Sequence, residues 1–443
     1  MENKRKRNIT IASIAIIILL VVAIGSSFAY FLSQRETEEF TVQSGNLSID
    51  FSTTSTISLT NTIPLAEDEY LTEGSVNTFT VKNSASSTVD AYARMDITDI
   101  TISDNLKDYD FKWALYEGDT KLTTGSFVTL KDGGNSINIA NNLSFPRNGS
   151  AKTYKLYVWL NETEADQSNL FNGTFSGKVT VTGQSKKINT LASNILEEVP
   201  KTNPSFTQTH TDKGLFVQQD DSTKSNYGFP TYYYRGDVTN NYVSFEGQTW
   251  RIVRINEDGS IRLIYESGAQ TEPVKTSYFS DVYYCSGYVG SNLETSIKNW
   301  YNSNISNKSI IIIGDYCNMN WVDHNYSFEP IFTCNGGTII NEKYATLTAD
   351  EAVFAGGLFG NVLLNTSSYL ETSDADWWLI TTNFAGLPGQ QACQAWLYIA
   401  DPGIPDYGYD ATQTATFRPV INLKPDVTIS GGTGTSSNPY VIK

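Results

Sequence analysis

The sequence predicts a mostly β protein with three parts: an apolar N-terminal helix, an antiparallel β-sandwich and an α+β domain. A basic cluster followed by an apolar stretch predicts the helix. Apolar residues that alternate with polar ones predict the sandwich, and strands and helices without βαβ alternation predict the α+β domain. A chain of 443 residues is long enough for two domains of ordinary size.

The N-terminus is typical of an exported protein. Four basic residues at 4–7 precede an almost wholly apolar stretch over residues 9–32. This order is typical of a signal peptide or a single membrane anchor, with the rest of the chain outside the cytoplasm. Ser27-Phe28-Ala29 is a small-x-small pattern, which predicts cleavage between Ala29 and Tyr30. Left uncleaved, the stretch has the roughly 20 residues that span a bilayer. Residues 1–29 are therefore predicted to be a signal peptide or a membrane anchor.

Residues 30–183 are predicted to form the β-sandwich. Apolar residues occupy every second position of several short segments, for example Leu47, Ile49, Phe51 and Tyr154, Leu156, Val158, Leu160. This period means that each strand has one buried and one exposed face, and turn-forming residues separate the strands. One short helix is expected at 163–171.

Residues 184–213 are predicted to be a linker, with a short helix at 190–198, and residues 214–443 the α+β domain. Glu246-Gly247 and Asp258-Gly259 fall between alternating runs, which predicts a three-stranded meander over 242–265. An amphipathic helix is expected at 293–301, and the Thr348–Glu351 capping box begins another. Strands are expected at 377–380, 417–423 and within 427–442.

The charge argues against nucleic acid as a partner. The chain carries 47 acidic and 31 basic residues, a net charge of −16. Without residues 1–29, which hold four basic residues and one acid, 46 acidic and 27 basic residues remain, a net charge of −19. A surface this acidic repels phosphate backbones and anionic lipids.

Four cysteines, Cys285, Cys317, Cys334 and Cys393, lie in the C-terminal half. In an exported chain an even number favours two disulfides, with three possible pairings. Free buried thiols are the alternative. A zinc site is disfavoured because no CxxC motif occurs and the chain has two histidines.

The sequence contains no motif of a common catalytic site: neither GxSxG, HExxH, a P-loop nor a dinucleotide fingerprint occurs. We interpret His210 and His324 as surface residues, and Asp374/Asp376 as one of the carboxylate pairs that arise by chance in an acidic chain. We therefore predict no enzymatic activity, no cofactor and no metal.

Trp377 and Trp378 are the candidate binding residues. Adjacent residues of a strand point to opposite faces, so one ring could be exposed as a stacking platform for a sugar or a partner. Packing of both rings inside the domain is the alternative. Arg235-Gly236-Asp237 matches an integrin-binding tripeptide, and we interpret it as a turn with a structural arginine. Arg418 is expected to form a buried ion pair.

The N-terminal part resembles TasA/camelysin-type proteins. The resemblance rests on Phe28-Ala29-Tyr30-Phe31, on the strand from Phe40 to Asp50, and on two later segments, 153–161 and 175–181. It covers residues 1–183 and implies a signal peptide of the SipW-processed type. It also implies a secreted jelly-roll sandwich that, in some relatives, assembles into matrix fibres by lending an N-terminal strand to a neighbour.

The C-terminal part, 214–443, resembles an uncharacterised domain of Firmicutes surface proteins. The matching segments are 234–237, 250–255, 347–351, 355–357, 377–378, 418–424 and 431–440. Its layout is similar to C-type-lectin-like folds. The resemblance implies a Cys317–Cys334 disulfide, which leaves Cys285 to pair with Cys393.

These observations together predict a non-enzymatic cell-surface or extracellular-matrix protein. The sandwich would support self-assembly or act as a stalk, and the C-terminal domain would bind a surface glycan or protein. If uncleaved, the N-terminal helix would tether the chain to the membrane. An extracellular enzyme that acts on polysaccharide or envelope polymer is the alternative.

Overall fold

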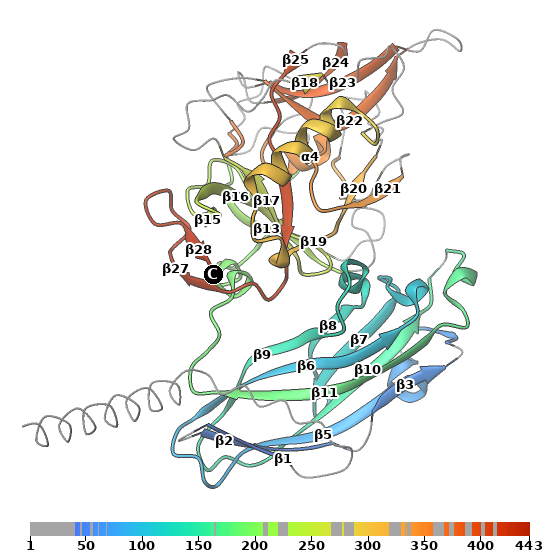
Figure 1. Ribbon diagram of the computed structural model, residues 1–443, viewed down its shortest axis with the longest axis vertical. Coiled ribbons are helices and arrows are strands. Elements are labelled where there is room, and N and C mark those ends of the chain that lie inside the picture. The colour runs from blue at the N-terminus through green and yellow to red at the C-terminus, as the bar shows by residue number, and fades with distance from the viewer. Residues whose placement is uncertain are drawn as a thin grey trace, which may run out of the picture. The chain divides into compact units, whose positions relative to one another are not determined.

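The computed structural model describes residues 40–44, 47–53, 56–60, 62–67, 69–163, 165–206, 211–219, 229–266, 277–278, 288–318, 329–332, 334, 338–357, 367–371, 376–385, 392–399, 404–410 and 414–443. The chain divides into two compact units, Met1–Ile188 (unit 1) and Asn189–Lys443 (unit 2) (Figure 1). Strands dominate both units and most pair antiparallel, as predicted.

Unit 1 contains two sheets in its described residues. One has the order β1 (Phe40–Ser44), β2 (Leu47–Thr53), β5 (Ser75–Asn83), β10 (Lys152–Asn161), β7 (Phe111–Glu117), β8 (Thr120–Ser126), with β4 (Pro64–Leu65) parallel to β10. The other has the order β3 (Ile57–Thr60), β11 (Thr174–Gln184), β6 (Ala91–Ile102), β9 (Ile137–Phe145). The short helices are α2 (Tyr70–Glu73), η1 (Asp104–Leu106), η2 (Val128–Asp132) and η3 (Ser168–Leu170).

The two sheets of unit 1 share one apolar core, which confirms the predicted sandwich. In β5 the buried side chains of Phe79 and Val81 alternate with more exposed threonines, the period of a strand with one buried face. Phe111 of one sheet and Phe175 of the other have ring centroids 5.5 Å apart. The first sheet therefore buries one face against the second.

The outer face of the first sheet carries a second cluster, which we call the outer aromatic cluster: Tyr70, Tyr116, Tyr157 and Trp159. Tyr70, from α2, stacks on Trp159 with ring centroids 3.9 Å apart, and its hydroxyl lies 2.6 Å from that of Tyr116. Because α2 covers these rings, this face of the sheet is also partly buried. At the helix expected over 163–171, the described residues, 163 and 165–171, form the single turn η3.

Residues 189–206 belong to unit 2, which differs from the predicted linker. Thr190 caps the short helix α3 (Leu191–Ile195) by accepting the Ser193 N–H at 3.1 Å. Leu191 and Ile195 are fully buried in the core of unit 2. Apolar residues four positions apart share one face of a helix, and that face packs where it is shielded from water.

The main sheet of unit 2 has the order β12 (Lys201–Thr202), β13 (Gly214–Gln218), β14 (Thr231–Arg235), β16 (Gln248–Ile255), β15 (Tyr242–Phe245), β28 (Tyr440–Ile442), β27 (Ile429–Gly431). β17 (Ile261–Tyr265) pairs with β16, and β26 (Val420–Leu423) pairs with β17 and β19 (Ile311–Ile312). The predicted meander is confirmed as β15, β16 and β17. Its first turn has Glu246 and Gly247 at positive φ, 56° and 71°.

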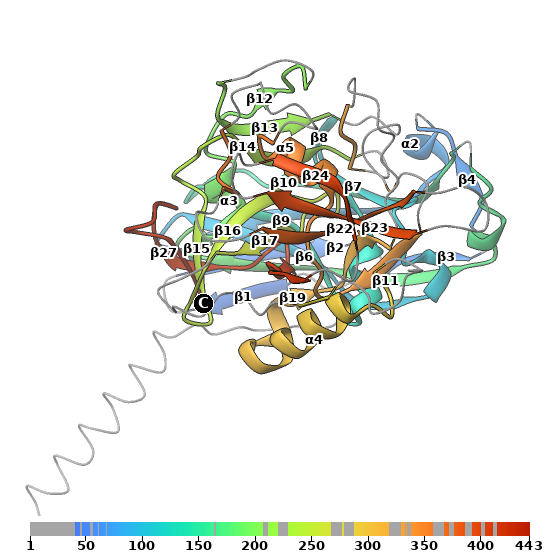
Figure 2. The same ribbon diagram turned by 90° about the horizontal axis from the view of Figure 1, so that it is seen from above.

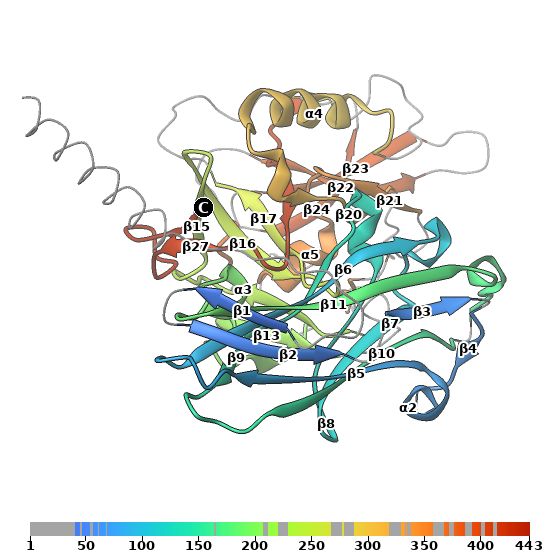
Figure 3. The ribbon, with the colours of Figure 1, turned by 60° about the horizontal axis from the view of Figure 1, so that its bottom comes forward.

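Besides α3, the helices among the described residues of unit 2 are α4 (Asn292–Asn304), α5 (Ala349–Phe354) and the 3₁₀ turn η4 (Lys308–Ile310). α4 lies at the surface of unit 2 (Figure 3) and turns Leu293, Ile297 and Tyr301 inward. The smaller sheets are β18 (Ser277–Tyr278) with β25 (Thr414–Ala415) and β20 (Gly314–Cys317) with β21 (Ile339–Glu342) (Figure 1). A third small sheet is formed by β22 (Trp377–Ala385), β23 (Ala392–Ile399) and β24 (Ile404–Asp410) (Figure 2).

In the described part of the chain, no helix has the length and apolar character needed to cross a membrane. The predicted signal peptide or anchor, residues 1–29, lies outside the described residues.

Candidate functional site

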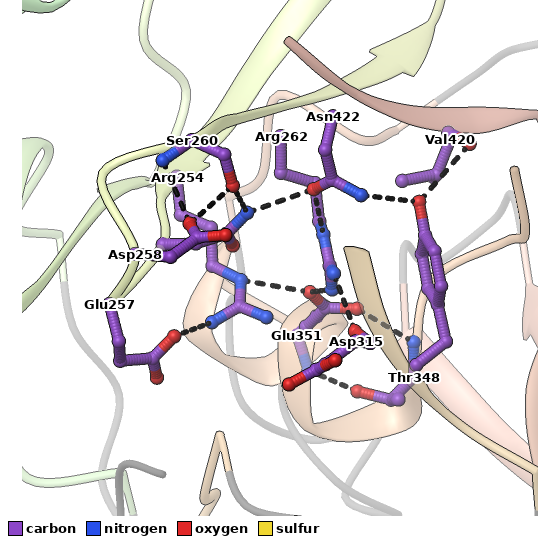
Figure 4. Close-up of polar contacts among 12 residues, drawn as sticks. Arg254, Glu257, Asp258, Ser260, Arg262, Asp315, Thr348, Glu351, Val420 and Asn422 are labelled. Carbon is purple, nitrogen blue, oxygen red and sulfur yellow. Dashed lines mark hydrogen bonds and ion pairs between the residues drawn. The ribbon is translucent and has the colours of Figure 1, made fainter. Parts of the chain in front are cut away.

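The densest buried group of charges lies in unit 2, where β16 and β17 meet the N-terminus of α5 (Figure 4). Arg254 of β16 and Arg262 of β17 are opposite one another in the antiparallel register. Both are buried, with 5% and 2% of their surface exposed. Two like charges opposite each other destabilise a sheet unless a counter-charge lies between them.

Glu351 supplies that counter-charge, and we call Arg254, Arg262 and Glu351 the buried triad. Its Oε1 accepts Arg254 Nε at 3.1 Å and Arg262 Nη1 at 2.5 Å. Its Oε2 accepts the Thr348 N–H at 3.1 Å, while Thr348 Oγ1 accepts the Glu351 N–H at 3.1 Å. The predicted capping box is therefore confirmed, and its glutamate also joins two strands to the helix.

The triad keeps Glu351 ionised. Burial alone would raise the pKa of Glu351, but the charges of Arg262 and Arg254 and the Thr348 N–H together hold it below its ordinary value. The Glu351 charge in turn raises the pKa of Arg262 against the opposite effect of burial. Glu351 and Arg262 therefore stabilise each other's charged form.

A polar and aromatic shell surrounds the triad. The Arg262 guanidinium lies 4.4 Å from the ring centroid of Tyr316, and that of Arg254 lies 4.6 Å from Phe332. Asn422 Oδ1 accepts Arg262 Nε at 3.1 Å, and Asn422 Nδ2 donates to Tyr316 Oη at 2.7 Å. This shell fixes the orientation of both arginines.

A cavity of about 20 Å³ adjoins the triad, beside the Cys317–Cys334 disulfide. This volume holds one water molecule or a comparably small ion. The cavity is far smaller than the roughly 300 Å³ or more of a pocket that encloses an organic ligand. Within the described residues, no group of three or more His, Cys, Asp and Glu side chains could hold a metal ion.

A second ion pair joins the buried Arg418 to Glu266, whose side chain is 21% exposed. Arg418 Nη2 donates to Glu266 Oε2 at 2.7 Å, and Arg251 Nη1 lies 3.6 Å from the other carboxylate oxygen. Arg418 also donates to two backbone oxygens, of Tyr265 and Leu370. Arg418 thus forms the predicted buried ion pair.

The two candidate binding tryptophans are both buried. Trp377 is 1% exposed and Trp378 is 0% exposed. The Arg418 guanidinium lies 5.4 Å from the ring centroid of Trp377. The expectation of an exposed stacking ring is therefore wrong, because β22 is buried on both faces here. Both tryptophans are packed inside the domain, which was the alternative interpretation.

Arg235 of the Arg-Gly-Asp tripeptide is likewise internal, at 2% exposed. Its Nη1 donates to the backbone oxygens of Val353 at 2.6 Å and Phe354 at 3.1 Å, at the end of α5. A guanidinium held in this way stabilises the negative end of the helix. Arg235 is therefore structural, as we interpreted it, and is buried from any receptor.

The Cys317–Cys334 disulfide is present, as the resemblance implied. Of the other predicted pair, Cys285 lies outside the described residues, and for Cys393 only the backbone, in β23, is described. Ala29, Tyr30, His210, His324 and Asp374 also lie outside the described residues.

Sequence reasoning missed the buried triad as a unit. Glu351 was identified as a capping residue, but its arginine partners are 97 and 89 residues away along the chain. One signal could have pointed to the partner in β16. Arg251 and Arg254 interrupt an otherwise apolar run, Trp250–Ile255, whose strand is buried on both faces.

Comparison of the chain with family models, with curated proteins and with solved structures found no match.

Proposed function

We propose that the chain is a non-enzymatic protein of the bacterial cell surface or extracellular matrix. Unit 1 would serve assembly or act as a stalk, and unit 2 would bind a glycan or a protein. The observation that carries the proposal is the engagement of Glu351 by two arginines and a backbone N–H. A general acid or base must reach a substrate proton, whereas this carboxylate is buried and already bonded at both oxygens.

Because the cavity beside the triad is too small for such ligands, the proposed ligand site lies on the surface of unit 2. A cavity of about 20 Å³ does not admit a sugar ring or a peptide. The alternative, an extracellular enzyme, would place its reacting groups elsewhere in unit 2.

The finer fold assignments belong to the same proposal. The sequence resemblances support a TasA-like jelly roll for unit 1 and a C-type-lectin-like fold for unit 2. The basic and apolar N-terminus supports export, with residues 1–29 cleaved as a signal or kept as a membrane anchor. N-terminal sequencing of the cell-surface form separates the two: a chain that begins at Tyr30 is released, and one that begins at Met1 is tethered.

Self-assembly through an N-terminal strand is supported by the position of β1. It lies at the edge of its sheet and follows directly on the N-terminal segment. An edge strand presents backbone donors and acceptors that a second copy can pair with. Deletion of residues 30–44 should abolish polymers seen by electron microscopy, and unchanged polymers would contradict the proposal.

The binding role is tested by probing arrays of glycans and envelope polymers with the chain that begins at Tyr30. Products are analysed in the same samples. Saturable binding without product supports the proposal, whereas turnover of a polymer favours the enzyme. As a control, the Glu351→Gln variant at a temperature where it remains folded should bind as the parent does, because the triad is not the ligand site.

A further inference from the structure

Lys112 stands apart from the other lysines of unit 1. Among the lysines whose side chains are described, it is the one that is buried, with 8% of its surface exposed. It lies on β7 and points to the same face as Tyr116, four residues on, which belongs to the outer aromatic cluster. Lysine is almost never buried without a specific chemical partner.

Asn161 lies on the neighbouring strand, β10, diagonally across from Lys112. Trp159 is directly opposite Lys112 in the register, and the Asn161 N–H donates to the Asp110 carbonyl at 2.8 Å. Trp159 Nε1 donates to Asn161 Oδ1 at 3.4 Å, so the carboxamide is directed toward the residue opposite Lys112. Diagonal neighbours have Cβ atoms about 7–8 Å apart or less, within reach of a long side chain. Asn161 is itself buried, at 7% exposed.

Asp110 completes the group. It lies two residues before Lys112 in the chain, directly before β7, and its backbone is opposite that of Asn161. Its Oδ2 accepts a hydrogen bond from Gln167 Nε2 at 2.8 Å. The same Gln167 nitrogen donates to the backbone oxygen of Asn161 at 2.8 Å. Burial raises the pKa of Asp110, against smaller opposing effects of Gln167 and Lys112. A carboxyl group with a raised pKa therefore belongs to a residue that lies two positions before Lys112 and opposite Asn161.

We propose that Lys112 and Asn161 form an intramolecular isopeptide bond, with Asp110 transferring the protons. The Asp110 carboxylate first takes one proton from the Lys112 ammonium, as a general base. The neutral Nζ attacks Asn161 Cγ and forms the new C–N bond. A proton passes from Nζ to Nδ2 through the Asp110 carboxyl group, the Cγ–Nδ2 bond breaks, and ammonia leaves.

The reaction needs no oxidant and no external reactant. One amine and one carboxamide become one secondary amide and one ammonia, and ammonia finally takes up the proton that Asp110 first received. Fixed geometry makes the attack effectively unimolecular, which accounts for reaction at an otherwise unreactive amide. The product would covalently join β7 to β10, two adjacent strands inside the first sheet.

The mass of the folded, purified full chain tests the proposal directly. Loss of ammonia lowers the mass by about 17 Da relative to the sequence. A succinimide at Asn148-Gly149 would give the same loss, so the location must be shown. Trypsin should release one branched peptide in which residues 108–121 are joined to residues 156–178, because modified Lys112 is not cleaved.

Three variants and one matched control complete the test. Lys112→Arg, Asn161→Ala and Asp110→Ala should each restore the mass calculated from the sequence. Lys155→Arg, at a partly exposed lysine of β10, should keep the loss. A parent protein at the unmodified mass, or a loss that persists in Lys112→Arg, overturns the proposal. The parent protein needs no variant to fold: an unmodified parent mass overturns the proposal by itself, and the branched tryptic peptide assigns a loss of about 17 Da to Lys112 and Asn161.

Discussion

Replacing Glu351 by glutamine should destabilise unit 2 through a named set of contacts. The change leaves the shape of the side chain almost unaltered but removes the negative charge between two arginines. The side chains of Arg254, Arg262 and Glu351 are only 6%, 3% and 3% exposed, so water cannot replace the lost carboxylate. Removal of one partner from such a buried group costs about 3–5 kcal/mol. For a unit of this size, that lowers the melting temperature by about 6–20 °C.

The chain offers a matched control in Glu294→Gln. Glu294 occupies the same third position of α4 that Glu351 occupies in α5. Its Oε2 accepts the Gly290 N–H at 2.6 Å, and Ser291 Oγ accepts the Glu294 N–H at 3.0 Å. Among the described residues no arginine pairs with it. The control therefore measures the capping contribution alone, which should be about 1 kcal/mol or less.

Urea unfolding is monitored by hydrogen–deuterium exchange, and the exchange is measured separately for each peptide. Peptides from β16 and β17 report on unit 2, and peptides from β5 and β10 report on unit 1 as an internal reference. The free energy of unfolding should fall in the first set for Glu351→Gln and remain unchanged in the second. Losses within about 0.5 kcal/mol of each other in the two variants would show that Glu351 acts only as a cap, and the reasoning from the triad would fail.

Three further outcomes are expected. The pKa of Glu351 is depressed in the folded state, so the stability that its charge contributes is complete above pH 4.5, its ordinary pKa, and is lost as the pH falls below that value. The stability of the Glu351→Gln variant should therefore fall less steeply with decreasing pH than that of the parent in acid unfolding curves. Replacing Cys317 and Cys334 by serine should cost unit 2 about 3 kcal/mol, and dithiothreitol should lower the melting temperature of that variant less than that of the parent. Burial and the Tyr70 hydroxyl raise the pKa of Tyr116 to about 12. Tyr70→Phe should therefore lower that pKa toward 10, as measured by NMR titration of labelled tyrosine rings. An unchanged pKa would show that burial alone raises it.

Local signals in the sequence predicted local structure well. Glu246-Gly247 and Asp258-Gly259 marked the two turns of the meander, because residues at positive φ leave few alternatives to a tight turn. The Thr348–Glu351 pair marked the start of α5 for a similar reason, since both hydrogen bonds of a capping box lie within four residues.

Interactions between distant segments could not be predicted in the same way. Alternation along β22 separated Trp377 from Trp378 into two faces but could not reveal that both faces are covered. The apolar pair Leu191 and Ile195 lies in a polar segment that has the composition of a linker, and only the core of unit 2 explains why α3 is fixed. The partners of Glu351 come from strands nearly a hundred residues earlier, so nothing near α5 in the sequence indicates them.

The order of strands in unit 2 has a consequence for synthesis, which proceeds from the N-terminus. In unit 1, both sheets are complete once β11 is available. In unit 2, β28 pairs with β15, almost two hundred residues earlier, and β26 pairs with β17 and β19. The sheet that holds both arginines of the triad therefore stays incomplete until residues 420–442 have emerged. Unit 1 can fold while the chain is still being synthesised, whereas unit 2 must wait for its last strands and exposes its apolar segments to chaperones and proteases in the meantime.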